Sequence, residues 1–315
     1  MRAVMNTEDG IRVVDAVDPA DPGGDGGGVR LSVVSAGICG TDVSFAAAGV
    51  SGFIFGHEFA GVDGNGKGYF VEPAIYGGKC RECRGGNTQR CTEPGHGHLG
   101  IFRDGGMAQR VVVPEYTLLP LPAQLDVRDA CLIEPGAVAW HGMHQARVKP
   151  GERVLVVGGG SIGLLAAAAA RYQGFHVDVE ARHDHQLAAA EQLGAGRPGS
   201  DYDVVLDAAG TESSLARSAE AARPGGRIVS LGVFQTTMPV PGVMSLTKEL
   251  TYVNSIAYGR HDGVRETGEV AAMLAANPDI AQAVITHRYP IGEATEAFRV
   301  AAGRDAGAIK VVIEP

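Results

Sequence analysis

Two short runs near the start of the chain carry side chains that bind transition metals. Cys39 opens the run Cys39-Gly40-Thr41-Asp42, and the run Gly56-His57-Glu58 follows it. Together they offer a thiolate, an imidazole and a carboxylate, which are donor types that Zn²⁺ accepts in a tetrahedral shell. A catalytic zinc has three protein ligands and keeps the fourth position open for water or substrate. The two runs therefore predict a catalytic zinc site.

A glycine-rich loop later in the chain has the pattern of a dinucleotide site. Gly158, Gly160 and Gly163 form G-x-G-x-x-G between an apolar run at residues 154–157 and an alanine-rich helical pattern. Glycines at these positions permit a tight turn and the close approach of a pyrophosphate to the free N–H groups of a helix N-terminus. We expect the loop to bind the dinucleotide together with the first helical residues, Ser161 and Ile162. The alternative is a compact strand-to-helix turn with no ligand.

The end of the second predicted strand bears on the choice of cofactor. An NAD site places an acidic residue there, which binds the ribose 2′-hydroxyl. By register from the turn at residues 193–195, this position falls on Ala181, and Arg182 and His183 follow. A guanidinium suits a 2′-phosphate, so the sequence favours NADP(H) over NAD(H). A register shift of one residue would place Glu180 there and favour NAD(H) instead.

Composition narrows the class of protein. The chain has 315 residues, enough for two domains, and its net charge of -9 argues against a surface for nucleic acid or anionic membrane. The N-terminal residues lack the long apolar core of a signal peptide, and the most apolar stretch, residues 162–170, is too short to span a bilayer. Five cysteines, an odd number, indicate reduced thiols rather than a disulfide framework. We therefore expect a cytoplasmic protein.

The distribution of strand and helix patterns predicts two domains. The first part is rich in strand and turn patterns, whereas apolar runs alternate with helical patterns beyond residue 137. Such alternation indicates parallel βαβ units with right-handed crossovers. The tail returns to short strands. We therefore predict an α/β protein with a discontinuous β-rich domain at 1–137 and 277–315, and a doubly wound parallel sheet at 138–276.

These motifs, with the Asp104-Gly105-Gly106 turn and Glu134-Pro135, resemble the zinc-dependent medium-chain alcohol dehydrogenase family. The resemblance covers nearly the whole chain and implies a GroES-like catalytic domain and a Rossmann domain. It implies zinc ligands at Cys39 and His57, a third at Glu134, and Glu58 as an alternative or exchanging ligand. Asp42 is placed to hydrogen-bond the ligand imidazole and fix its tautomer.

The resemblance also implies a route for the substrate proton. Thr41 corresponds to the hydroxyl that receives this proton, and many relatives carry a histidine three residues further that passes it to solvent. This chain has Ser44 there, which makes the last step of the relay an open question. The implied reaction moves a hydride between the nicotinamide and a small-molecule alcohol or carbonyl. The Glu134-Pro135 pair resembles the sorbitol and threonine dehydrogenase branch, which favours a secondary alcohol, such as a polyol or an aminocyclitol-like compound.

A second metal lobe is incomplete. Cys80, Cys83 and Cys91 match three of the four thiolates that hold a structural zinc in the family, and the fourth position falls on Gly77. Because a structural zinc needs a closed shell, the lobe requires another ligand, such as Glu72, His96 or His98. The alternative is a lobe of free thiols that keeps its shape by packing.

Several further expectations follow. Segments 62–69 and 194–203 are shorter than in most relatives, and the second lacks a strand-helix stretch. Candidate walls of the substrate pocket are aromatic: Phe45, Phe53, Phe102, Trp140 and Phe234.

A homodimer or homotetramer is expected from the family. The rival function is a nucleotide-binding sensor or structural subunit that has lost catalysis.

Overall fold

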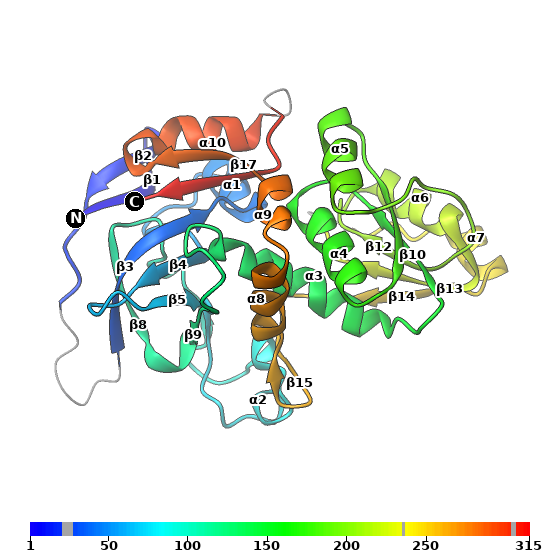
Figure 1. The fold of residues 1–315 in the computed structure, drawn as a ribbon, viewed down its shortest axis with the longest axis horizontal. Coiled ribbons are helices and arrows are strands. Elements are labelled where there is room, and N and C mark those ends of the chain that lie inside the picture. Colours follow the sequence, from blue (N-terminus) through cyan, green and yellow to red (C-terminus); the bar gives the residue numbers. More distant parts are fainter. Residues whose placement is uncertain (21–27, 235–236, 304–306) are drawn as a thin grey trace. The chain divides into compact units, whose positions relative to one another are not determined.

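The computed structural model describes residues 1–20, 28–234, 237–303 and 307–315 (Figure 1). The chain folds into two compact units. The first comprises Met1–Glu134, Gly259–Ala281 and Ile285–Pro315, and the second comprises Pro135–Tyr258 and Gln282–Val284.

The junctions of these units differ from the domain boundaries expected from the sequence, 137/138 and 276/277. Residues 259–276, which we expected in the Rossmann domain, belong to the first unit. The Arg265 guanidinium donates to the backbone oxygens of Leu118 and Tyr116 at 3.0 and 2.8 Å, and the Thr267 hydroxyl donates to Glu72 at 2.5 Å. These bonds attach the segment to the first unit, and nothing in its helical pattern revealed them.

The first unit is built around a seven-stranded sheet. Its strand order is β17-β18-β3-β4-β5-β9, and β8 also pairs with β3. All pairs are antiparallel except β17–β18. The strands of this sheet are β3 (Gly28–Gly37), β4 (Glu58–Val62), β5 (Gly68–Val71), β8 (Arg110–Pro114), β9 (Leu118–Pro120), β17 (Ile285–Pro290) and β18 (Lys310–Glu314).

Smaller elements complete the first unit. Three two-stranded sheets are formed by β1 (Arg2–Thr7) with β2 (Gly10–Asp15), β6 (Ala74–Ile75) with β7 (Gly97–His98), and β15 (Arg260–His261) with β16 (Val264–Arg265). The helices are α1 (Gly40–Ala47), α2 (Arg81–Arg84), α8 (Glu266–Ala276), α10 (Ala294–Ala302) and the short turns η2 (Thr88–Arg90), η3 (Glu115–Thr117), η4 (Ala130–Leu132) and η5 (Ile291–Glu293). The α9 helix (Asp279–Val284) runs from the first unit into the second.

The Asp104-Gly105-Gly106 turn fixes the loop that precedes β4. The Gly106 N–H donates to the Gly56 oxygen at 2.8 Å, and the Asp104 carboxylate accepts from the Ile54 N–H at 2.9 Å. A Cβ on Gly106 would lie 2.1 Å from the Phe59 ring, and one on Gly105 would lie 2.2 Å from the Gly56 oxygen. Only glycines allow this approach, so the turn supports the backbone on either side of His57.

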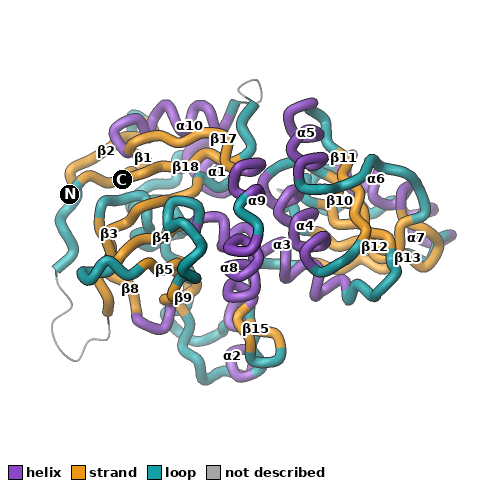
Figure 2. The backbone as a smooth tube through the Cα atoms, in the orientation of Figure 1, coloured by secondary structure: helices purple, strands orange, loops and turns teal. Residues whose placement is uncertain are grey.

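The second unit is a five-stranded parallel sheet flanked by helices (Figure 2). Its order, β11-β10-β12-β13-β14, places the reversal of strand order between β10 and β12, where ligands of such sheets bind. This arrangement confirms the predicted doubly wound sheet. Its elements are α3 (Ile133–Ala146, starting in the first unit), β10 (Arg153–Val157), α4 (Ser161–Tyr172), β11 (His176–Glu180), α5 (Asp184–Gln192), β12 (Tyr202–Asp207), α6 (Glu212–Ala221), β13 (Ala222–Ser230), α7 (Gly242–Thr247) and β14 (Thr251–Asn254).

The segment between α5 and β12 contains no further strand or helix. A single parallel bridge between Asp178 and Gly196 extends the sheet beyond β11. The buried Asp178 carboxylate accepts a bond of 2.6 Å from the Tyr202 hydroxyl, and this closes the shortened connection over the edge of the sheet. Among the described residues, no helix combines the length and apolar character that crossing a bilayer requires.

Candidate active site

The antiparallel ladder between β3 and β4 brings the first two expected zinc ligands together. Gly37 pairs with Glu58 at the end of this ladder. Cys39 lies two residues beyond Gly37, and His57 lies one residue before Glu58, so both leave the sheet at the same end. The ligand atoms of Cys39, His57 and Glu58 all lie within 4.8 Å of one another. Strand pairing thus creates the S, N and O donor set that the two sequence runs predict.

Asp42 lies beside both of these expected ligands. Cys39 is the N-cap of α1, and its N–H donates to the Asp42 carboxylate at 2.9 Å. The other Asp42 oxygen lies 3.5 Å from Nδ1 of His57, and both side chains are buried. Burial lowers the pKa of His57, but the charges of Asp42 and Cys39 outweigh this effect and hold it well above its usual value. Asp42 therefore occupies the position expected of a residue that orients the imidazole.

Glu58 is paired with a lysine that was not among the candidate site residues. Lys310, in β18, donates to both Glu58 oxygens at 2.8 and 2.6 Å and to the Ile38 carbonyl at 3.0 Å. Both side chains are almost fully buried, with 2% and 1% of their surface exposed. A Cβ on Gly37 would lie 2.2 Å from a Glu58 oxygen, so this pair requires glycine on the neighbouring strand.

Glu134 lies close to the cluster but outside the group of mutually close ligand atoms. Its side chain is buried at the start of α3. Burial raises the pKa of Glu134 to about 7; the charge of His57 opposes this rise, and that of Glu58 adds to it. A buried carboxyl group in this state gains from a nearby cation, which fits an additional metal ligand.

Thr41 and Ser44 lie on the first two turns of α1. Thr41 is half-buried and Ser44 is exposed. Residues three apart on a helix are neighbours on its surface, so the two hydroxyl groups occupy one side of α1, with Ser44 nearer to solvent.

Three of the five aromatic residues proposed as pocket walls cluster beside this helix. Phe45, one turn beyond Thr41, contacts Phe102 with ring centroids 5.5 Å apart, and Phe53 lies 5.8 Å from Phe102. Phe53 is buried, whereas Phe102 is 70% exposed and has a positive φ of 58°. Phe45 and Phe102 therefore present an apolar surface on the Thr41 side of the first unit. Trp140 and Phe234 belong to the second unit.

The glycine loop joins β10 to α4 as expected for a dinucleotide site. Gly158 has φ of 114°, which only glycine adopts readily, and a Cβ on Gly163 would lie 1.8 Å from the Gly158 oxygen. A Cβ on Gly160, at the N-cap of α4, would meet nothing within 4 Å. Gly158 and Gly163 are therefore required by the fold. Gly160 instead faces open space beside the helix N-terminus, where a pyrophosphate fits.

The loop after β11 carries the residues expected to select the cofactor. Ala181 follows β11 directly, and its Cβ would lie 2.5 Å from a Cβ placed on Gly159. The Glu180 carboxylate accepts two bonds from the Arg217 guanidinium at 3.0 and 2.8 Å. Exposed Arg182 donates to Ser213 at 3.3 Å, and the ring of His183 stacks on that of His185.

Comparison with known proteins identifies the class to which this site belongs. Two family models match: the alcohol dehydrogenase GroES-like domain at residues 25–123 and the glucose dehydrogenase C-terminus at residues 130–314. The chain is 30% identical over 299 residues to L-galactonate-5-dehydrogenase of Escherichia coli, covering 85% of this chain and 86% of the relative. The chain belongs to the zinc-dependent medium-chain alcohol dehydrogenase family.

Solved structures agree with this assignment. Galactitol-1-phosphate dehydrogenase of Escherichia coli has a TM-score of 0.88 and 26% identity, with complete coverage of both chains. A dehydrogenase of Sinorhizobium meliloti, bound to NADP, has a TM-score of 0.84 and 27% identity, and the match covers 100% of this chain and 99% of that chain. The expected GroES-like and Rossmann fold is confirmed, and the protein is an oxidoreductase of the alcohol dehydrogenase class.

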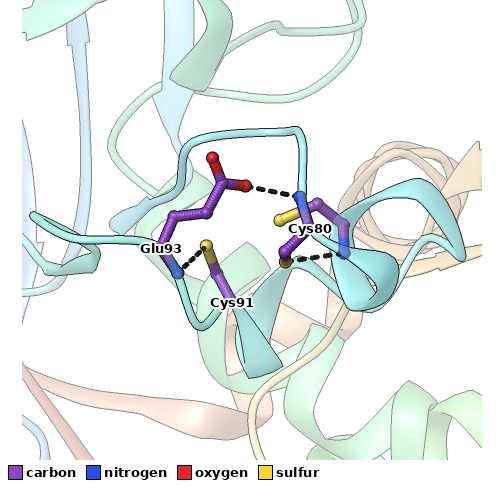
Figure 3. Close-up of side chains that lie close together, drawn as sticks. Cys80, Cys91 and Glu93 are labelled. Atoms are coloured by element: carbon purple, nitrogen blue, oxygen red, sulfur yellow. Dashed lines mark hydrogen bonds between the residues drawn. The ribbon is translucent and has the colours of Figure 1, made fainter.

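The second metal lobe of the dehydrogenase contains one residue that the sequence did not suggest. Cys80, Cys83 and Cys91 lie with Glu93 in a group whose ligand atoms are all within 4.8 Å of one another (Figure 3). Backbone N–H groups of Thr92 and Cys83 lower the pKa of Cys80 to about 7, whereas burial and the neighbouring thiols raise that of Cys83 to about 12. The other suggested ligands are not in this group: Glu72 accepts from Thr267, and the His96 ring faces the Glu93 carbonyl.

Cys131 is a core residue, as expected, and none of the five cysteines forms a disulfide. Burial raises the pKa of Cys131 to about 12, which keeps it protonated and unreactive at neutral pH.

Two glycines of the dinucleotide loop should respond differently to alanine. In Gly163→Ala the added Cβ meets the Gly158 oxygen, so the free energy of unfolding should fall by about 1–3 kcal/mol. In Gly160→Ala the Cβ enters open space, so stability should change by less than about 1 kcal/mol while dinucleotide affinity falls. Urea unfolding and nucleotide titration of both variants separate these effects. Unchanged dinucleotide affinity in Gly160→Ala would contradict the assignment of Gly160 to the ligand.

The metal-free protein should show a pH effect from Glu134. Its pKa is 4.5 in the unfolded chain and about 7 in the fold, so between these values the folded state binds more protons. The contribution of Glu134 to the free energy of unfolding is therefore fully present below pH 4.5 and is lost as pH rises through about 7. Glu134→Gln should remove this loss from the unfolding free energy measured across that window. The exposed-residue control Glu8→Gln should leave it unchanged; an equal slope in wild type and Glu134→Gln would refute the effect.

Proposed function

We propose that this protein oxidises a secondary alcohol carbon of a polyhydroxylated small molecule, such as a polyol or sugar acid, with NADP⁺, or reduces the corresponding ketone with NADPH. The observation that carries the proposal is the cluster of Cys39, His57 and Glu58 at the start of the helix that bears Thr41. Relatives named for a sugar acid and a polyol phosphate support the substrate class. The expected homo-oligomer and cytoplasmic location stay predictions.

Cys39 and His57 hold the zinc in this proposal, and Glu134 completes the protein ligands. Proximity favours Glu58, which belongs to the tight group of ligand atoms. Charge balance favours Glu134, because both Glu58 oxygens already accept bonds from buried Lys310. Taking Glu58 away from Lys310 would leave a buried ammonium uncompensated, at a cost of about 3–5 kcal/mol. On this ground we assign Glu58 to Lys310 and Glu134 to the metal.

The bound zinc would supply a Lewis acid that polarises the substrate oxygen and eases loss of its proton. The residues of the chain then move this proton. The Thr41 hydroxyl accepts it and releases its own proton towards solvent on the side of Ser44. Asp42 keeps the His57 ring in one orientation, and the Phe45 and Phe102 rings present an apolar surface beside Thr41. In the overall reaction the substrate carbon gives up a hydride to the nicotinamide, and the reverse reaction returns it.

Charge around β11 supports NADP(H) as the preferred cofactor. The residue after β11 is the neutral Ala181, and Arg182 follows with its guanidinium exposed. The one carboxylate that would favour a ribose hydroxyl, Glu180, is neutralised by Arg217. A 2′-phosphate would thus meet Arg182 and His183, and Glu180 would not oppose it as a free carboxylate.

Zinc-dependent catalysis makes a prediction about Cys39 and Thr41. Activity with NADPH and a panel of ketoses, keto sugar acids and aminocyclitol ketones should vanish in Cys39→Ser together with the catalytic zinc. In Thr41→Val, which loses only the hydroxyl, kcat should fall about 10²–10⁴-fold with zinc content unchanged. Thr41→Ser restores a hydroxyl and should recover most of the rate. Full activity of Thr41→Val would exclude Thr41 from proton transfer, and binding of NADPH without turnover of any substrate would favour the sensor function.

Cofactor choice can be tested at two neighbouring positions. Arg182→Ala should raise the KM for NADPH by about tenfold or more, as expected for one lost charge-assisted bond, and leave the KM for NADH unchanged. Ala181→Asp should reverse the preference, because a carboxylate repels the 2′-phosphate and binds a ribose hydroxyl. Arg197→Ala, which removes an exposed arginine paired with Glu191, is the control. A KM for NADPH that is the same in Arg182→Ala and the control would refute the proposed selectivity.

A further inference from the structure

The cysteine lobe is organised around a space that a fourth ligand must fill. α2 starts at Cys80, its N-cap, and η2 ends directly before Cys91. The Cys83 N–H points to the Cys80 sulfur at 3.5 Å. The Glu93 N–H points to the Cys91 sulfur, also at 3.5 Å (Figure 3). N–H groups directed at sulfur stabilise thiolates, so the backbone is arranged for sulfur atoms that carry negative charge.

Glu93 occupies the space that a side chain at position 77 would need. A Cβ built on Gly77 lies 2.3 Å from one Glu93 oxygen, 2.6 Å from its carboxyl carbon and 3.1 Å from its Cβ. The carboxylate and a residue 77 larger than glycine therefore exclude each other. Since the family places its remaining thiolate at position 77, the missing sulfur and the incoming carboxylate share one location.

The backbone holds Glu93 in this position. One of its oxygens accepts from the N–H groups of Lys79 and Cys80, each at 2.6 Å. A carboxylate has about four lone-pair sites, so two backbone bonds leave capacity for a metal. The side chain is half-buried and its carboxylate lies within 4.8 Å of the three sulfur atoms.

We propose that Glu93 is the fourth ligand of a structural zinc whose other ligands are Cys80, Cys83 and Cys91. Four anionic ligands give the site the same net charge as four thiolates, which a histidine would not. A carboxylate oxygen is an accepted zinc ligand, and the resulting shell is closed. Because oxygen is a harder ligand than sulfur, this zinc should dissociate more readily than one held by four thiolates.

The lobe is attached to the rest of the first unit, so its metal would stabilise more than the lobe itself. The Arg260 N–H in β15 donates to the Gly86 oxygen at 2.8 Å, and a Cβ on Gly86 would lie 2.7 Å from the Arg260 oxygen. The loop between Cys83 and Cys91 thus supports the β15–β16 hairpin.

Metal binding can be measured without the catalytic site, so the test is independent of the proposed function. In full-length Cys39→Ser protein, which lacks the catalytic zinc, the lobe should still bind about one Zn²⁺ per chain. Adding Glu93→Gln keeps the size and an acceptor for the Lys79 and Cys80 N–H groups but removes the anionic oxygen. Removing a residue that only hydrogen-bonds a metal ligand lowers metal affinity about 10–100-fold. Removing Glu93, a direct ligand, should therefore lower Zn²⁺ affinity at least about 100-fold. The matched control is Glu82→Gln in α2, whose carboxylate pairs with Arg90 at the surface.

A rescue variant distinguishes a ligand from a residue that only holds the lobe in shape. Gly77→Cys combined with Glu93→Ala, which removes the carboxyl group that the Gly77 Cβ would meet, should restore tight binding, and the sulfur-to-metal charge-transfer absorption of the Co²⁺ form should rise from that of three thiolates to that of four. The proposal is overturned if the Cys39→Ser protein binds no Zn²⁺, or if Glu93→Gln and Glu82→Gln bind it equally. It is also overturned if the rescue variant shows the same Co²⁺ absorption as the chain with Glu93, because the fourth position would then not be shared.

Discussion

The active site depends on one buried ion pair, that of Glu58 and Lys310. Lys310 lies in the last strand of the chain, and it reaches Glu58 at the start of β4 and the Ile38 carbonyl one residue before Cys39. An unpaired charge in this interior would cost several kcal/mol. The pair therefore joins the tail of the chain to both segments that carry metal ligands, and Gly37 is the residue whose lack of a side chain makes room for it.

In each unit of the dehydrogenase, close backbone packing positions the groups expected to bind metal or nucleotide. In the first unit, Gly105 and Gly106 press the turn after residue 103 against Gly56, next to His57. In the second unit, Gly163 packs α4 against the Gly158 carbonyl and so brings the helix N-terminus to the end of β10. Glycine is required in both cases because backbone atoms occupy the place of the side chain. The metal site and the nucleotide site thus share a design in which a short glycine motif fixes the direction of the neighbouring residues.

Two departures from the family are balanced by a nearby side chain. Gly77 replaces a thiolate, and the Glu93 carboxylate fills the space that becomes available. The shortened connection before β12 is closed by the bond between Tyr202 and Asp178. Loss of a family residue in the sequence therefore does not by itself indicate loss of the corresponding chemistry.

The sequence alone determined the family, the two-domain fold and the identity of the main candidate residues, because these depend on short motifs with fixed local geometry. Cys39, His57 and the glycines at 158, 160 and 163 could all be named from spacing. The tertiary structure decided what depends on residues distant in the chain: Lys310 beside Glu58, Arg217 beside Glu180, and the bonds of Thr267 and Arg265 that attach α8 to the first unit. Glu93 was missed although it lies two residues from Cys91, because a carboxylate becomes a ligand candidate only when folding brings it to the place left by Gly77. A ligand set is defined by distances between side-chain atoms, and spacing in the sequence determines those distances only within one turn, helix or strand pair.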